Sequence, residues 1–217
     1  MPTHADVIAA VQAGDAARVR TLLGDDPSLA AAKDGNGVSA LMFAFYYRRR
    51  EIADLLLAAK SDLDIFEATA AGKSDKVSEI IKKDAESAKR WSADGFTPLH
   101  LAAFFGHAEI ARMLIRNSAD VSSTSKNSMK VAPLHSAAAA HNREIVRLLL
   151  ENDAPADIRQ EGGWTPLHEA AQIGDVEMTR DLLQHGADPQ ARSNDGKTPA
   201  DMAAAKGHEE ILKLLSK

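Results

Sequence analysis

The sequence predicts an all-α solenoid, built from about seven helix-turn-helix units in a single domain that spans residues 1–217. Three observations favour this fold. Short apolar helices recur in pairs, glycine-containing turns close them, and the pattern returns with a period of 33 residues, measured from Ala132 to Thr165 and again from Thr165 to Thr198. Such a period is typical of stacked helix pairs that bury their apolar faces against their neighbours.

The most complete copy of the repeated segment is residues 163–175, which read Gly-Trp-Thr-Pro-Leu-His-Glu-Ala-Ala-Gln-Ile-Gly-Asp. Thr165 can cap a helix through its hydroxyl, and Pro166 suits the first helical position because no N–H is needed there. Gly174 can close the helix in a left-handed conformation. An apolar pattern at helical spacing follows at 178–183, which predicts a second helix directly after the first.

Further copies of the motif occur in the same context, at Thr97-Pro98-Leu99-His100, Pro133-Leu134-His135 and Thr198-Pro199. Repeated in register, this motif resembles the ankyrin repeat, most closely from about Arg90 to Lys217. The resemblance implies a short β-hairpin finger before each helix pair and a structural role for the motif histidines. It also implies that the concave face binds a protein partner, so that the chain is a non-catalytic adaptor, scaffold or inhibitor.

The expected units differ in completeness. Their approximate bounds are 3–32 for an N-terminal cap, 33–64, 65–89, 90–121, 122–157, 158–189, and 190–217 for a C-terminal cap. The third unit lacks a finger, because the helix expected from Ile65 follows Asp64 directly and the step from Arg48 to Gly72 is 24 residues. A second offset, of 58 residues from Gly14 to Gly72, makes the third unit resemble an internal copy of the N-terminal cap.

The amino-acid composition argues against several classes of function. The chain has no cysteine and a formal net charge of −5, so neither a Cys-based zinc site nor general nucleic-acid binding is expected. No apolar run approaches the roughly 20 residues of a membrane helix, and no secretion signal begins the chain, which favours a cytoplasmic protein. His168-Glu169 resembles half of a zinc-protease motif, but Gln172 replaces the second histidine. We therefore expect no catalytic residue, metal, cofactor or small-molecule substrate.

The aromatic residues are the strongest candidates for a binding site. The resemblance implies that contacts come from the residue before each motif and from the two residues before the closing glycine. Together with an adjacent arginine, the candidates are Tyr46, Tyr47, Arg48, Phe96, Phe104, Phe105, Trp164 and Ile173. Clustered exposed aromatic side chains mark interaction sites. Since no finger precedes the third unit, we expect a cleft there, with aromatic walls and a floor of Ala70 and Ala71.

Other interpretations remain open. The second and fourth units can lean together and fill the gap with their own aromatic side chains. Arg48–Arg50 forms a basic cluster that can bind an anion or a nucleic acid. The aromatic patch can also be an interface between copies of a self-associating structural protein, and the unusual third unit can hold an unrecognised catalytic site.

Two segments carry predictions about the backbone. Arg48 occupies the position at which other units have their closing glycine, so we expect it to adopt a left-handed conformation. Residues 122–130 form a finger that is longer than the others, and residues 122–128 are all small or polar. Such residues bury little apolar surface, so we expect this finger to be mobile.

Overall fold

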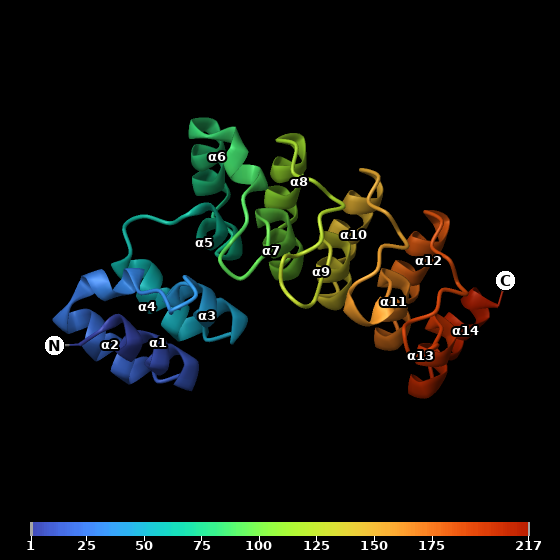
Figure 1. The fold of residues 1–217 in the computed structure, drawn as a ribbon, viewed down its shortest axis with the longest axis horizontal. Coiled ribbons are helices and arrows are strands. Elements are labelled where there is room, and N and C mark those ends of the chain that lie inside the picture. Colours follow the sequence, from blue (N-terminus) through green and yellow to red (C-terminus); the bar gives the residue numbers. More distant parts are fainter. Residues whose placement is uncertain (1, 217) are drawn as a thin grey trace.

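The computed structural model describes residues 2–216 and is all-helical, with no β-strand among those residues (Figure 1). The α-helices of this part of the chain are α1 (His4–Ala13), α2 (Ala16–Asp25), α3 (Ala40–Tyr46), α4 (Arg50–Ala59), α5 (Ile65–Ala70), α6 (Ser74–Lys83), α7 (Pro98–Phe105), α8 (Ala108–Arg116), α9 (Pro133–Ala139), α10 (Arg143–Leu150), α11 (Pro166–Ile173), α12 (Val176–Gln184), α13 (Pro199–Lys206) and α14 (Glu209–Leu215). Its 3-10 helices are η1 (Pro27–Ala31), η2 (Ala85–Lys89) and η3 (Glu161–Gly163).

The helices are stacked in two rows. Each odd-numbered helix packs against the even-numbered helix that follows it, and the odd-numbered helices form one continuous row from α1 to α13. The even-numbered helices form a second row, in which every step is closely packed except the step from α4 to α6. Figure 1 shows α4 and α6 set apart, with residues 60–64 as an extended connection. The prediction of an all-α solenoid is confirmed, and the stack is interrupted after its second helix pair.

The fingers are tight turns and not the β-hairpins that the resemblance implied. Within residues 2–216 the β-bridges amount to one isolated pair, Lys33 with Ser39. The first finger is closed by a main-chain hydrogen bond from Asp34 N to Val38 O at 2.9 Å. The Asp34 carboxylate also accepts hydrogen bonds from Asn36 N at 3.0 Å and from Val38 N at 2.9 Å. A turn side chain therefore satisfies the donors that a ladder would otherwise pair.

The first and third helix pairs are followed by the same local structure. Asp26 caps η1 and Asp84 caps η2, with φ/ψ of −149°/98° and −153°/98°. η1 and η2 are themselves related by the 58-residue offset that the sequence shows. The third pair thus has the backbone of an N-terminal cap. It also lacks a finger, because α5 begins at Ile65 directly after its capping residue Asp64.

The apolar core is divided at the same place. One cluster of buried side chains joins α1–α4, and a larger cluster runs from α5 to α14. A small third cluster, which we call the seam, connects the two; its buried members are Val38, Met42, Ala70 and Leu101, and the side chains packed against them are Phe43, Phe45, Tyr46, Phe66, Phe96 and Phe105.

Arg48 adopts the left-handed conformation that its position predicts, with φ of +54°. His141, at the equivalent end of α9, has φ of +57° and was not anticipated. At four of the closing glycines a side chain of the next unit approaches the site of the missing Cβ to 2.7–2.9 Å; the pairs are Arg49 on Gly14, His107 on Gly72, Asn142 on Gly106 and His208 on Gly174. Glycine is thus required for close approach as well as for φ. Lys73 occupies the same position in the third unit as Arg49 does in the second. The closing residue on which it would pack, one unit earlier, is Arg48 and not a glycine.

The long finger at 122–130 is hydrogen-bonded to the finger before it. Lys126 N donates to Gly95 O at 2.8 Å, and Asn127 Nδ2 donates to Asp94 O at 2.9 Å. Composition, on which the expected mobility was based, does not reveal these polar contacts between fingers. They favour an ordered segment.

Candidate protein-binding surface

The motif histidines join the fourth, fifth and sixth units to the finger that follows each of them. Nδ1 of His100 accepts a hydrogen bond from Thr97 N at 3.2 Å, so Nε2 carries the proton and donates to Val131 O at 2.9 Å. The equivalent bridges are His135 Nε2 to Trp164 O at 3.1 Å and His168 Nε2 to Lys197 O at 3.0 Å. Burial lowers the pKa of His100 and of His135 to about 4. These two rings are therefore neutral at pH 7, with Nδ1 accepting from the N-cap of their own helix and Nε2 donating to the next unit.

The histidine bridge is missing at the step from the second unit to the third. Met42 takes the position of the motif histidine in the second unit, and its side chain is buried in the seam. The third unit has no finger whose carbonyl could accept a bond, so an apolar side chain suits this position. In the third unit Glu67 replaces the histidine, and it forms an ion pair with Lys60 at 2.5 Å in which both side chains are largely buried.

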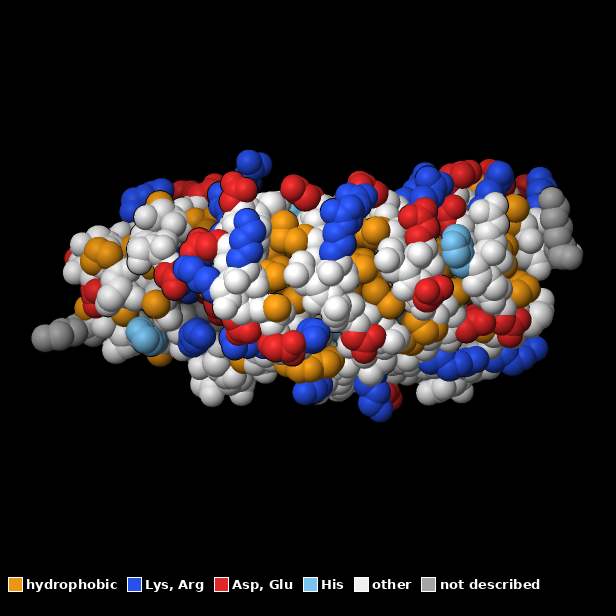
Figure 2. Space-filling view, turned by 90° about the horizontal axis from the view of Figure 1, so that it is seen from above, with side chains coloured by type: hydrophobic (Ala, Val, Ile, Leu, Met, Phe, Trp, Pro, Cys, Tyr) orange, Lys and Arg blue, Asp and Glu red, His pale blue; other side chains and the backbone are white. Residues whose placement is uncertain are grey.

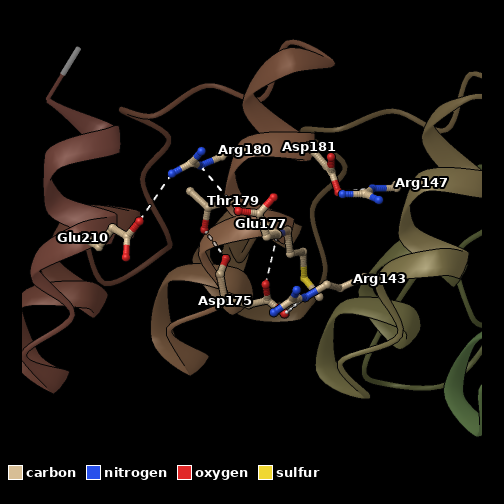
Figure 3. A network of polar contacts seen from close by, with 9 residues as sticks. Arg143, Arg147, Asp175, Glu177, Thr179, Arg180, Asp181 and Glu210 are labelled. Atoms are coloured by element: carbon tan, nitrogen blue, oxygen red, sulfur yellow. Dashed lines mark hydrogen bonds and ion pairs between the residues drawn. The ribbon is translucent and has the colours of Figure 1, made fainter.

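Ion pairs along the even-numbered helices make a second set of ties between units. Near the C-terminus they are Arg143–Asp175 at 2.8 Å, Arg147–Asp181 at 2.7 Å and Arg180–Glu210 at 3.3 Å (Figure 3). Earlier steps have Arg20–Glu51 at 2.8 Å and Arg112–Glu144 at 3.4 Å. Arginine recurs six residues after the helix-closing residue, at positions 20, 112, 147 and 180, but the second unit has Asp54 there. The series therefore has no donor at the step from α4 to α6.

The face of the molecule drawn in Figure 2 carries charges of both signs. Figure 2 shows basic and acidic side chains interspersed over it, with hydrophobic side chains between them. Charges of alternating sign are typical of a solvated surface. Most of the candidate binding residues lie on the odd-numbered helices and on the fingers.

The predicted cleft between the second and fourth units is closed on the finger side, and the prediction was wrong there. Tyr46 stacks on Phe105 with ring centroids 6.1 Å apart, and its hydroxyl donates to Asp94 Oδ2 at 2.6 Å. Phe45 meets the same ring edge-on at 5.9 Å. Burial raises the pKa of Tyr46, and the Asp94 carboxylate adds to this effect, so the hydroxyl stays protonated. The aromatic side chains fill the space of the missing finger because this removes their apolar surface from water.

Two of the aromatic candidates remain exposed. Tyr47 is 48% exposed and stacks on Phe43 at 6.1 Å. Phe104 is 40% exposed and meets Phe105 edge-on at 5.1 Å. Because Phe105 is held in the seam, Phe104 is a fixed aromatic side chain on the surface.

Phe104 lines a groove of about 480 Å³ between α7, α9 and the fingers that precede them. We call it the apolar groove, since its lining includes Tyr46, Phe96, Leu101, Phe104, Met129 and Val131. Gln160 and Glu169 also line it, and burial raises the pKa of Glu169. Met129 is 49% exposed. Met129 was not among the candidates predicted from the sequence, although it is the large apolar residue of the otherwise polar long finger.

A second groove, of about 520 Å³, shares Phe104 with the first and lies against α4 and the C-terminal ends of α3, α5 and α7. We call it the basic groove; its lining includes Phe45, Arg48, Arg50, Asp54, Ala71, Lys73, Phe104 and Phe105. The predicted floor residue Ala71 is therefore present in an open groove, whereas Ala70 is buried in the seam. Lys73 was not anticipated as part of any site.

Trp164 and Ile173 lie apart from these grooves. Trp164 is half-buried beside His168, with ring centroids 5.9 Å apart, and Ile173 packs against the larger core. The structure brings together most candidates of the second and fourth units, namely Tyr46, Arg48, Phe96, Phe104 and Phe105. It does not join the two candidates of the sixth unit to them. Tyr47, the remaining candidate of the second unit, lines neither groove.

The stacked helix pairs, the histidine bridges and the two grooves define a helical repeat protein. A model of the family "Ankyrin repeats (3 copies)" matches residues 65–161 and 134–217, and the chain belongs to the ankyrin-repeat family. Ankyrin repeats are generally non-catalytic modules of protein–protein interaction. None of the helices between Pro2 and Ser216 has the length and apolarity that crossing a bilayer requires.

One curated relative is Ankyrin repeat and SAM domain-containing protein 6 of Danio rerio, to which this chain is 33% identical over 95 residues. The match covers 39% of this chain and 13% of that protein. The chain therefore corresponds to a small part of the length of this relative.

Proposed function

We propose that this chain is an adaptor, scaffold or inhibitor in the cytoplasm and binds a protein partner through the apolar groove. The observation that carries the proposal is the position of the exposed large hydrophobic side chains. Among residues 2–216 these are Tyr47, Phe104 and Met129, and the last two line the same groove. Exposed apolar side chains that line one concavity are typical of the anchor sites of protein interfaces.

The groove is already formed without a partner. Phe96 packs on the His100 ring at 5.9 Å, and that ring is fixed by its bridge to Val131 O. Leu101 at the base is buried in the seam. A preformed wall loses little conformational freedom on binding, which favours affinity. A partner segment with one or two large apolar side chains fits this groove.

The test places a photo-crosslinking phenylalanine analogue at position 104 of the full chain, in extract of the source cells. The matched control has the same analogue at position 116, on the exposed side of α8. We expect a crosslinked protein from position 104 alone. Met129→Glu should lower its yield by about tenfold or more, because a charge in the groove repels an apolar anchor.

Two results would contradict the proposal. Equal crosslinking from both positions would show that the groove has no preference for the partner. Crosslinking between copies of this chain, with a mass that rises with concentration in light scattering, would favour a self-associating structural protein instead.

A further inference from the structure

We infer that the basic groove is a second docking site, which binds an acidic protein segment that presents carboxylates next to an aromatic or aliphatic side chain. The inference does not depend on a partner in the apolar groove. The two grooves share Phe104, but Arg48, Arg50 and Lys73 line the basic groove and not the apolar groove.

The cations of this groove have no counterion within the described chain. Arg48, Arg50 and Lys73 are exposed, and none of them forms an ion pair with a carboxylate of residues 2–216. Asp54 is the carboxylate among the lining residues. On a chain whose net charge is −5, three uncompensated cations against one carboxylate make a local site for negative charge.

These cations are free because the interruption of the stack leaves them without a structural role. Arg49, by contrast, packs over Gly14 in the manner of the other units. Lys73 occupies the corresponding position one unit later, but Arg48 stands where it would need a glycine. With Asp54 at the arginine position of the ion-pair series, the arginine–carboxylate pair is absent at this step. The ion pairs that do cross it, Lys60–Glu67 and Lys76–Asp62, use none of the three cations of the basic groove.

Arg48 also keeps an unfavourable backbone conformation. Its φ of +54° is one that glycine adopts without strain and that other residues rarely adopt. Strained residues of this kind concentrate at binding sites, where a side chain is needed in spite of the strain. Here the strain places a guanidinium on the wall of the basic groove.

The rest of the lining selects an amphipathic ligand. Phe104 and Phe105 form an aromatic wall, and Ala71 leaves room on the floor. A carboxylate can pair with the guanidinium groups, while a neighbouring apolar side chain packs on the aromatic wall. A nucleic acid is a poorer match, because its affinity depends on many phosphate contacts and this chain is acidic overall. The chemistry of the groove therefore fits an acidic peptide segment.

The experiment titrates the full chain into a fluorescein-labelled peptide of alternating Glu and Phe residues and measures the fluorescence anisotropy of the peptide. We expect Arg50→Glu combined with Lys73→Glu to weaken binding at least about tenfold. The matched control is Lys206→Glu combined with Lys213→Glu, which changes the net charge equally at exposed positions of the last unit. This control should bind within about twofold of the wild type, since distant exposed charges are screened.

Circular dichroism checks that every variant is folded, and Arg50→Gln combined with Lys73→Gln replaces the charge reversal if it is not. Three outcomes would overturn the inference: equal loss in the control variant, equal affinity for the same peptide with Gln in place of Glu, or equally tight binding of duplex DNA. Met129→Glu, which tests the apolar groove, should leave the affinity for this peptide unchanged, so the two sites can fail separately.

Discussion

The rings of Tyr46 and Phe105 stack 6.1 Å apart across the boundary between two hydrophobic cores. Tyr46 ends α3 and Phe105 ends α7, so the contact joins helix pairs that are not neighbours in the chain. It is possible because no finger separates them. It also compensates for the histidine bridge and the arginine–carboxylate pair that are missing at the step after the second unit.

We expect Phe105→Ala to lower the free energy of unfolding by about 2–3 kcal/mol, less than for a fully buried phenylalanine because the side chain is half-buried. Phe104→Ala, which removes a neighbouring and more exposed ring, should cost less than about 1 kcal/mol. Urea denaturation followed by circular dichroism measures both. If the two substitutions were equally costly, Phe104 would be a packing residue, and the apolar groove would lose its anchor.

The divided core predicts that two probes of unfolding disagree. Trp91 and Trp164 both lie after Ile65, on the side of the larger core, whereas circular dichroism reports on all the helices. We expect the circular dichroism curve to begin its change at lower urea than tryptophan fluorescence, because α1–α4 have the smaller core. Phe105→Ala should widen the difference. Coincident curves in that variant would mean that the seam does not couple the two cores.

Replacing Arg48 with glycine should stabilise the fold. The change relieves the left-handed strain, and we expect about 0.5–1.5 kcal/mol after the greater freedom of glycine in the unfolded chain is considered. His141→Gly is the matched control, because its φ is +57°. Both variants should resist urea better, but Arg48→Gly alone should bind the acidic peptide more weakly. A lower midpoint for Arg48→Gly would show that the arginine makes a stabilising contact.

The motif histidines predict a loss of stability in mild acid. Burial lowers the pKa of His100 and His135 from 6.5 to about 4 in the folded chain. As the pH falls below about 6.5 the unfolded chain binds protons that the folded chain does not, so the free energy of unfolding decreases until about pH 4. The decrease can reach roughly 3 kcal/mol for each histidine.

Urea midpoints between about pH 7 and about pH 4.5 measure this slope. His100→Gln should lower the free energy of unfolding at pH 7. It should also make that free energy depend less steeply on pH, because one of the two titrating histidines is gone. A wild-type midpoint that stays constant through this range would contradict the assignment of neutral, buried rings.

Much of the fold follows from local sequence signals. Thr165 and Pro166 define where a helix starts, Gly174 defines where it ends, and the 33-residue period gives the stacking. Even the abnormal third unit was predicted, because the distance from Arg48 to Gly72 is a count along the chain. Such features depend on neighbours in sequence, and periodicity describes them well.

The site was predicted less well, because it depends on contacts between units. The sequence grouped Tyr46 with Phe105, but it could not show whether the two rings face each other across open space or stack. Met129 lies in a segment whose average composition is polar, so it was overlooked. The sequence indicates the basic cluster Arg48–Arg50 but does not indicate Lys73, which joins Arg48 and Arg50 only through the arrangement of the helices around the basic groove.

The interruption after α4 has a consequence for the shape of the array. The later steps of the stack have histidine bridges and arginine–carboxylate pairs, whereas the step after α4 depends on the seam and on the ion pairs Lys60–Glu67 and Lys76–Asp62. A ligand in the basic groove would contact Arg50 on α4 and Phe104 on α7, and so would lie across this joint. Binding there would fix the curvature of the whole array, and the distance between α2 and α14 would become more uniform although neither helix touches the ligand.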